Sequence, residues 1–219
     1  MDLQNFLAIV SVAAIPILLA ITLHEVAHGR VARRFGDRTA EASGRLSLNP
    51  MRHIDPVGTV LVPMVLLWLG GFLFGWAKSV PVNPRNLRQP RQDMVWVAAA
   101  GPSSNLLMAL GWAAALSFAQ HRLEGTVGEW LQSMASIGVS INLLLAVFNM
   151  LPVPPLDGGR VLANLLPPGP VSRLMAKIEP FGLFIVLGLL MTGILFFILS
   201  RPILALEGFI LGLVGAQNF

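Results

Sequence analysis

The sequence contains no cysteine, and only 12% of its 219 residues are charged. The absence of cysteine excludes a disulfide framework and a thiolate nucleophile, and it leaves nitrogen and oxygen ligands for any metal. A soluble domain would carry about twice this share of charged residues. Because 55% of the residues are hydrophobic and the mean hydropathy is +0.72, the composition indicates an integral membrane protein.

Long apolar blocks make up most of the chain, and five of them approach the roughly 20 residues that span a hydrocarbon core. They cover 6–28, 94–119, 133–151, 181–199 and 202–216. The last two are separated only by Ser200, Arg201 and Pro202, which predicts a tight helical hairpin. The first block lacks the basic region and the small-residue cleavage site of a signal peptide, so we expect it to be retained.

The segment 40–90 differs from these blocks because it is rich in proline, glycine and asparagine. Its repeated X-Pro steps disfavour helix and predict extended pieces at 44–50 and 79–84. Between them lies a sixth apolar block, 57–76, which Pro63 and Gly70-Gly71 interrupt. We therefore expect an all-α polytopic membrane protein of five to six transmembrane helices, with a re-entrant, partly extended loop between the first two long helices.

The strongest chemical signal is His24-Glu25-Val26-Ala27-His28, at the end of the first apolar block. Histidines four residues apart lie on one face of a helix, where both imidazoles can bind one zinc ion, and the glutamate beside them can activate a water. The alternative is a chance match at an ordinary helix end. Ionisable residues within a membrane segment rarely lack a role, which favours the metal site.

A hydrolytic zinc site keeps three protein ligands and leaves its fourth position open, so a third ligand is needed. The candidate is Asp157, which follows an apolar helix and a run of prolines and precedes Gly158-Gly159. Prolines end the helix, and glycines permit tight turns, so the carboxylate can project into a cavity. Taken alone, Asp157 is better interpreted as an ordinary loop aspartate, paired with Arg160; the two motifs together favour the metal ligand.

Three motifs together resemble the site-2 protease family of intramembrane zinc metalloproteases, over nearly the whole chain. They are His24 to His28, Gly101-Pro102-Ser103-Ser104-Asn105, and the stretch from Asn149 to Arg160. The resemblance implies one zinc ion held by His24, His28 and Asp157, with Glu25 as the catalytic base and Asn149 near the cleft. It also implies a membrane-embedded protein substrate cut in or near its transmembrane segment.

The same resemblance bears on domain organisation, because many members carry a PDZ or other regulatory domain. No polar stretch of this sequence is long enough for an additional soluble domain. We therefore expect a single integral membrane metalloprotease domain over residues 1–219, with 40–90 as its extended or re-entrant element. The sequence does not indicate an oligomeric state.

Shared zinc ligands restrict the membrane topology. The ends of the first helix and of 133–151 must lie on one side of the bilayer, so 94–119 runs oppositely and 57–76 crosses an even number of times. This arrangement places 13 of the 15 basic residues on one side. They are Arg30, Arg33, Arg34, Arg38, Arg45, Arg52, Lys78, Arg85, Arg88, Arg91, Arg160, Arg173 and Lys177. Because basic loops favour the cytoplasm, we expect a multi-pass cell-membrane protein with its active site toward the cytoplasmic face.

The pI of about 11.0 does not predict a nucleic-acid partner, because the basic residues lie in loops between apolar blocks. His53 could donate a hydrogen bond to the oxyanion or to a zinc ligand, or it could pair with Asp55. Asn149 could hold substrate or the oxyanion, whereas Asn105 is expected mainly to bond between helices.

Two other functions remain open from the residues alone. A metal transporter would need ligands continuing toward both faces, but the ionisable residues cluster at one depth. A non-proteolytic zinc scaffold would have no need of Glu25 beside the metal.

Overall fold

The computed structural model describes residues 3–217 apart from 63, 66–74, 76 and 168. The described residues form helices, short helical turns and irregular segments, without a β-strand. Among the described residues, five helical stretches are long and apolar enough to cross a membrane. They are Ile9–Arg34, Pro90–Arg122, Gly125–Asn149, Pro170–Met191 and Ile194–Val214. The predicted fold class is therefore confirmed.

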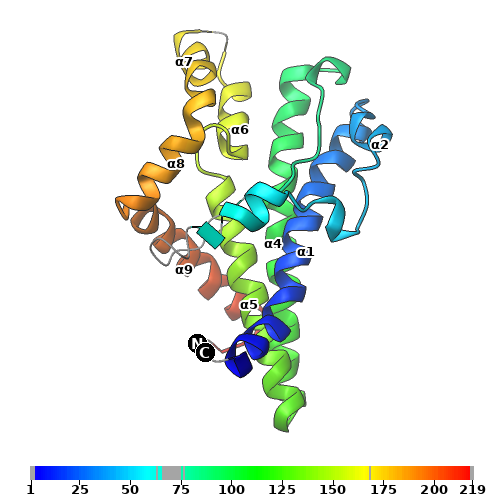
Figure 1. The fold of residues 1–219 in the computed structure, drawn as a ribbon, viewed down its shortest axis with the longest axis vertical. Helices are drawn as coiled ribbons and strands as arrows, with labels where there is room; N and C mark the ends of the chain where they lie inside the picture. Colours follow the sequence, from blue (N-terminus) through cyan, green and yellow to red (C-terminus); the bar gives the residue numbers. More distant parts are fainter. Residues whose placement is uncertain (1–2, 63, 66–74, 76, 168, 218–219) are drawn as a thin grey trace.

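Three long helices lie side by side at the centre of the molecule (Figure 1): α1 (Leu3–Arg34), α4 (Pro90–Arg122) and α5 (Gly125–Asn149). Where α4 meets α5, the buried side chains are mostly small or branched. They are Ala109, Ala113 and Leu116 on α4 and Ala135, Val139 and Leu143 on α5. Small residues let helix backbones approach closely, which is how membrane helices gain packing without a hydrophobic driving force between them.

The C-terminal part of the chain consists of α6 (Asp157–Leu165), α7 (Pro170–Ile178), the short turn η4 (Glu179–Phe181), α8 (Gly182–Met191) and α9 (Ile194–Val214). Helix α6 packs on α4, and α9 packs on α5 and α4. The outward side chains of α8 and α9 are large and apolar, with Phe184, Phe196 and Phe197 each more than two-thirds exposed. Such a surface suits contact with lipid.

The predicted hairpin at Ser200, Arg201 and Pro202 is wrong. Helix α9 continues through these residues, because a membrane helix accommodates the bond that proline removes. The chain turns earlier, at Gly193, whose φ of 74° is accessible to glycine without steric strain. The end of α9 lies beside the end of α4, since Ser117 Oγ donates a hydrogen bond to the Val214 carbonyl at 2.7 Å.

Between α1 and α4, the described pieces at 43–49 and 77–83 are irregular, as predicted for the extended pieces. The chain between these two helices also contains α2 (Thr39–Ala42), two 3-10 turns, η1 (Pro50–Arg52) and η3 (Pro84–Asn86), and a short π-helix, η2 (Pro56–Leu61). An Asn or Asp side chain caps the start of each X-Pro turn. The predicted re-entrant course of 57–76 falls largely on residues outside the described ones.

Asp37 fastens the returning segment to the end of α1. Its buried carboxylate accepts hydrogen bonds from the amides of Thr39 and Asn83, from the Asn86 side chain and from the Thr39 hydroxyl. Burial by itself raises the pKa of the Asp37 carboxyl, but the hydrogen bonds from Thr39, Asn86 and Asn83 outweigh it, so this pKa lies below its ordinary value. The segment at 79–86 is thereby held beside α1.

Candidate metal centre

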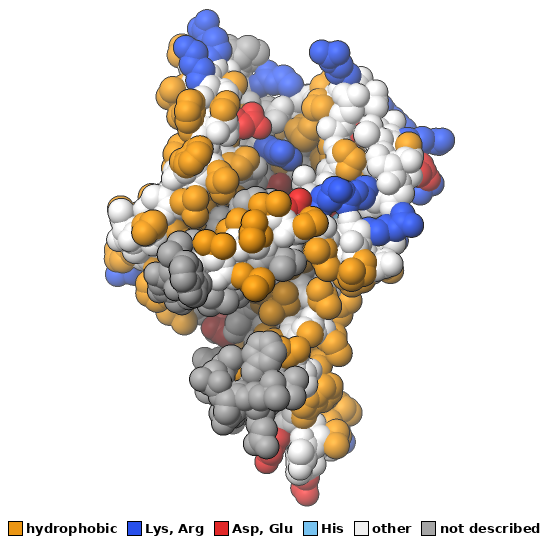
Figure 2. Space-filling view, in the orientation of Figure 1, with side chains coloured by type: hydrophobic (Ala, Val, Ile, Leu, Met, Phe, Trp, Pro, Cys, Tyr) orange, Lys and Arg blue, Asp and Glu red, His pale blue; other side chains and the backbone are white. Residues whose placement is uncertain are grey.

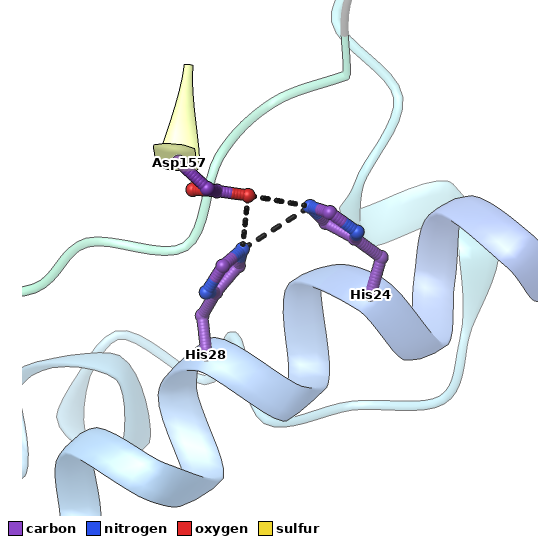
Figure 3. Close-up of side chains that lie close together, drawn as sticks. All are labelled: His24, His28 and Asp157. Carbon is purple, nitrogen blue, oxygen red and sulfur yellow. Dashed lines mark hydrogen bonds and ion pairs between the residues drawn. The ribbon is translucent and has the colours of Figure 1, made fainter. Parts of the chain in front are cut away.

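His24, His28 and Asp157 come together inside the helix bundle (Figure 3). The two histidines are one turn apart on α1, and Asp157 is the first residue of α6. All three side chains are buried. The structure thus brings the two sequence motifs to one point, although His28 and Asp157 are 129 positions apart in the sequence.

The three facing ligand atoms form a nearly equilateral triangle. His24 Nε2 and His28 Nε2 each lie 3.3 Å from Asp157 Oδ2, and they lie 3.1 Å from one another. Atoms bound at about 2.0–2.1 Å to a tetrahedral zinc ion are roughly 3.3 Å apart. The donor set therefore fits zinc in chemistry and in spacing.

The hydrogen bonds behind the two imidazoles determine which nitrogen carries the proton. His28 Nδ1 lies 2.7 Å from the Val97 carbonyl, which can only accept. His24 Nδ1 lies 2.5 Å from Asn105 Oδ1, while Asn105 Nδ2 donates to Asn142 Oδ1 at 2.9 Å. Both Nδ1 atoms therefore donate, and both Nε2 atoms present a lone pair to the triangle.

Asp157 Oδ2 adds a third acceptor to these two lone pairs. Among the described residues no group donates a hydrogen bond to this buried oxygen. Three converging acceptors without a proton between them are unfavourable unless a cation occupies the space. The electrostatics of the cluster therefore favour a bound metal ion.

The loop before α6 explains how Asp157 reaches this position. Helix α5 ends at Asn149, and the chain through the prolines at 152, 154 and 155 folds tightly against Gly158 and Gly159. A Cβ on Gly158 would stand 2.5 Å from the Leu151 carbonyl oxygen, and one on Gly159 would stand 2.5 Å from the Pro154 nitrogen. Side chains at these positions would push α6 away, so the glycine pair brings Asp157 inward.

The structure places Glu25 next to the returning loop. Its Oε2 accepts a hydrogen bond from the Val80 amide at 2.7 Å. Four residues further along α1, a Cβ on Gly29 would stand 2.5 Å from Leu46 Cδ2 and 2.9 Å from Val80 Cγ1. Both pieces that were predicted to be extended therefore meet α1 over Gly29, directly beyond Glu25.

His53 and Asn149 lie outside the cluster of ligand atoms. His53 is 2% exposed; its Nε2 lies 2.9 Å from the Ser47 carbonyl, and its own carbonyl accepts a hydrogen bond from the Lys78 amide at 2.8 Å. His53 therefore ties the two irregular pieces together. Asn149 Nδ2 donates to the Leu145 carbonyl at 2.9 Å in the last turn of α5.

Several supporting residues were missed or underrated by sequence reasoning. Asn105, expected to bond between helices, bonds directly to a predicted metal ligand, and Asn142 continues the chain to the Gly138 carbonyl at 2.8 Å. Gly101 has a steric role, because a Cβ there would stand 2.6 Å from Cε1 of both His24 and His28. The signal for the asparagines was their polarity within apolar helices.

Comparison with known proteins adds independent information. Peptidase family M50 matches residues 119–193, which include α5 and Asp157. The chain is 40% identical over 189 residues to YwhC of Bacillus subtilis, with 85% of this chain and 83% of YwhC covered. It is 32% identical over 178 residues to Rip2 of Mycolicibacterium smegmatis and 31% identical over 170 residues to Rip2 of Mycobacterium tuberculosis.

The names of these relatives give all three as candidate zinc metalloproteases. The two Rip2 matches cover 80% and 78% of this chain but only 64% and 62% of those proteins. The chain thus spans less than two thirds of Rip2. No solved structure gives a significant match.

Proposed function

The chain belongs to peptidase family M50, the site-2 protease family, and is a zinc metalloprotease, and we propose that it cleaves membrane proteins in or near their transmembrane segments. The observation that carries this proposal is the burial of three zinc-type ligands among helices long enough to span a bilayer. A protease site buried among membrane-spanning helices can reach peptide bonds within the bilayer, which soluble proteases cannot reach.

We assign zinc binding to His24, His28 and Asp157. When bound, zinc supplies Lewis acidity, which polarises a peptide carbonyl and acidifies water. Asn105 and the Val97 carbonyl hold the imidazoles so that both Nε2 lone pairs point at the ion. Such hydrogen bonds behind the ligands typically change metal affinity by about 10–100-fold.

Glu25 is assigned as the general base. It follows His24 on α1, and the Val80 amide donates to its Oε2, while no hydrogen bond to Oε1 is found among the described residues, so Oε1 can accept a proton from the attacking water. His53 and Asn149 are retained as proposed contributors. His53 Nε2 faces the Ser47 carbonyl and donates to it, so the neutral ring presents Nδ1, which is buried without a hydrogen-bond partner among the described residues, as an acceptor. The proposed donation to the oxyanion therefore requires Nε2 to leave the Ser47 carbonyl.

Substrate binding is assigned to the pieces at 44–49 and 79–83. A transmembrane helix hides its carbonyls in internal hydrogen bonds, so it must unwind before it is cut, and an unwound strand can pair with an extended backbone. Both pieces lie over Gly29 beside Glu25. Replacing Leu46 or Val82 with proline is expected to slow cleavage at unchanged zinc content, and unchanged cleavage would refute this assignment.

We propose that the active site faces the cytoplasm. Figure 2 shows Lys and Arg side chains gathered at the end of the molecule that carries α2, α6 and α7, above a broad apolar surface. Basic residues are retained on the cytoplasmic side during insertion, which supports this orientation.

The decisive experiment compares the wild type with Glu25→Gln on a panel of single-span substrates in detergent, with bound zinc measured in both. We expect about one zinc per chain in each and cleavage only by the wild type. Glu129→Gln is a matched control, because Glu129 is an exposed glutamate of α5. Cleavage by Glu25→Gln at the wild-type rate would refute the role of Glu25, and a wild type without zinc would refute the metal site.

A further inference from the structure

A basic hollow lies outside the metal centre, where the irregular segment folds back on itself. Its volume is about 300 Å³, and its lining includes Ser43, Arg45, Arg52 and Lys78, with Met51 and Ile54 as apolar neighbours. Apart from Gly44 and Arg45, which begin the piece at 44–49, none of the lining residues has a role in the proposed proteolysis. The hollow therefore requires a separate explanation.

The two arginines are held in place by the backbone of the same segment. Arg45 donates a hydrogen bond to the Arg52 carbonyl, and Arg52 Nη1 donates to the Gly44 carbonyl at 2.6 Å. Gly44 has a φ of 64°, and a Cβ there would stand 2.6 Å from Arg52 Nη1, so a larger residue would displace this guanidinium. Each guanidinium has five N–H groups, so both retain donors for a ligand.

The positive charge of this hollow is not balanced by carboxylates. In the part of the chain that the structure describes, Arg33 is the only arginine or lysine with an ion pair, formed with Glu41. Asp55 accepts from the Val57 and Gly58 amides, and residues 57–77 contain no acidic residue at all. Three cations converging without a counter-charge create a site for an anion.

The surroundings of the hollow indicate which anion. Leu48, Met51, Val57 and Leu61, in and next to this segment, are each at least 50% exposed. Basic groups beside exposed apolar side chains are typical of a surface at the boundary between headgroups and acyl chains. Arginine forks match phosphate oxygens, and anionic phospholipids concentrate basic segments at the cytoplasmic leaflet.

We propose that Arg45, Arg52 and Lys78 bind the phosphate of an anionic phospholipid headgroup, with the apolar side chains nearby covering its acyl chains. The Lys78 amide donates to the His53 carbonyl, and Val80, two residues later, donates to Glu25. A bound lipid would thus hold the segment that reaches the proposed base.

The test measures lipid binding to the purified full-length chain by native mass spectrometry, with phosphatidylglycerol and phosphatidylcholine of identical acyl chains. Lys78→Gln is the first variant, because it leaves both arginine–carbonyl hydrogen bonds intact; Arg45→Gln/Arg52→Gln is the second. Arg85→Gln/Arg88→Gln is the matched control, since both arginines are exposed, lie on the same basic side of the molecule and do not line the hollow. Zinc content reports folding in every variant.

We expect phosphatidylglycerol to bind the wild type at least tenfold more tightly than phosphatidylcholine. Lys78→Gln should weaken phosphatidylglycerol binding about fivefold and the double variant more than tenfold, while the control stays within about twofold. An equal loss in the control would overturn the proposal, because the effect would then be general surface charge. Displacement of the lipid by inorganic phosphate at equal concentration would also overturn it, because the site would then bind free phosphate.

Discussion

Gly101→Ala is expected to destroy the metal centre while leaving the helix that carries it intact. The new methyl group would stand 2.6 Å from Cε1 of His24 and of His28, whereas ordinary contacts begin at 3.4 Å. The substitution adds one carbon, and alanine is the best helix former, so α4 gains local stability of up to about 1 kcal/mol. Any loss of zinc therefore comes from the site and not from the helix.

The size of the expected loss in zinc affinity follows from how the imidazole rings of His24 and His28 are held. To restore ordinary contact, each ring would have to move by about 0.8 Å, several times the roughly 0.2 Å tolerance of a zinc bond. A ring that moves also breaks its hydrogen bond to Asn105 or to the Val97 carbonyl, which costs about 1–3 kcal/mol for a buried group. We expect zinc affinity to fall by at least about 100-fold.

The assay titrates each purified variant with a zinc chelator and measures the metal retained per chain, with helix content followed by circular dichroism. Gly111→Ala is the matched control, because Gly111 lies in the same helix and a Cβ there would meet nothing within 4 Å. The control should keep wild-type zinc affinity and cleavage. Wild-type zinc affinity in Gly101→Ala would refute the steric argument and with it the packing of α4 against the two histidines.

Two further predictions test the hydrogen bonds around the site. Asn142→Leu should weaken zinc binding about 10–100-fold in the same titration, because Asn105 then loses the acceptor that orients its amide toward His24; unchanged affinity would show that Asn105 needs no such support. Asp37→Asn should lower stability by about 1–3 kcal/mol at neutral pH. Because the pKa of Asp37 is lower in the folded than in the unfolded state, its contribution is fully present above an ordinary carboxyl pKa of about 4 and is lost as the pH falls through the folded value. Thermal unfolding of wild type and variant should therefore converge toward acidic pH, and a constant difference would contradict this assignment.

The sequence singled out candidate residues whose chemistry is distinctive, and the structure brings three of them, His24, His28 and Asp157, together. His24, Glu25, His28 and Asp157 stand out because charged and metal-binding groups are rare in an apolar chain. Three of the five predicted helices, those at 6–28, 94–119 and 133–151, match α1, α4 and α5. Helices α1 and α4 are longer than predicted at both ends, whereas α5 begins earlier, at Gly125, and ends at Asn149. Helix ends are polar and capped by loops, so hydropathy alone underestimates their length.

The prediction failed where backbone conformation decides the fold. Pro202 looked like a helix boundary, yet Gly193 is where the chain turns, because a membrane helix tolerates proline whereas a left-handed residue ends it. The single-domain organisation and the catalytic roles of His53 and Asn149 stay predictions. The side chains of His53 and Asn149 each bond to a backbone carbonyl, and such a bond is compatible with a structural role as well as a catalytic one.

Helix α4 contributes no predicted ligand, but it supplies most of the contacts that position the two histidines. Val97, Gly101 and Asn105 follow one another at intervals of four, so they form one stripe on α4. Val97 supplies a carbonyl acceptor for His28, and Asn105 supplies an acceptor for His24. Between them, Gly101 leaves space for both imidazole rings. A carbonyl and an absent side chain carry no signature in a sequence, which is why only Asn105 could be suspected. Sliding α4 by one residue would bring a Cβ against the imidazoles, so the register between α1 and α4 and the assembly of the zinc site depend on one another.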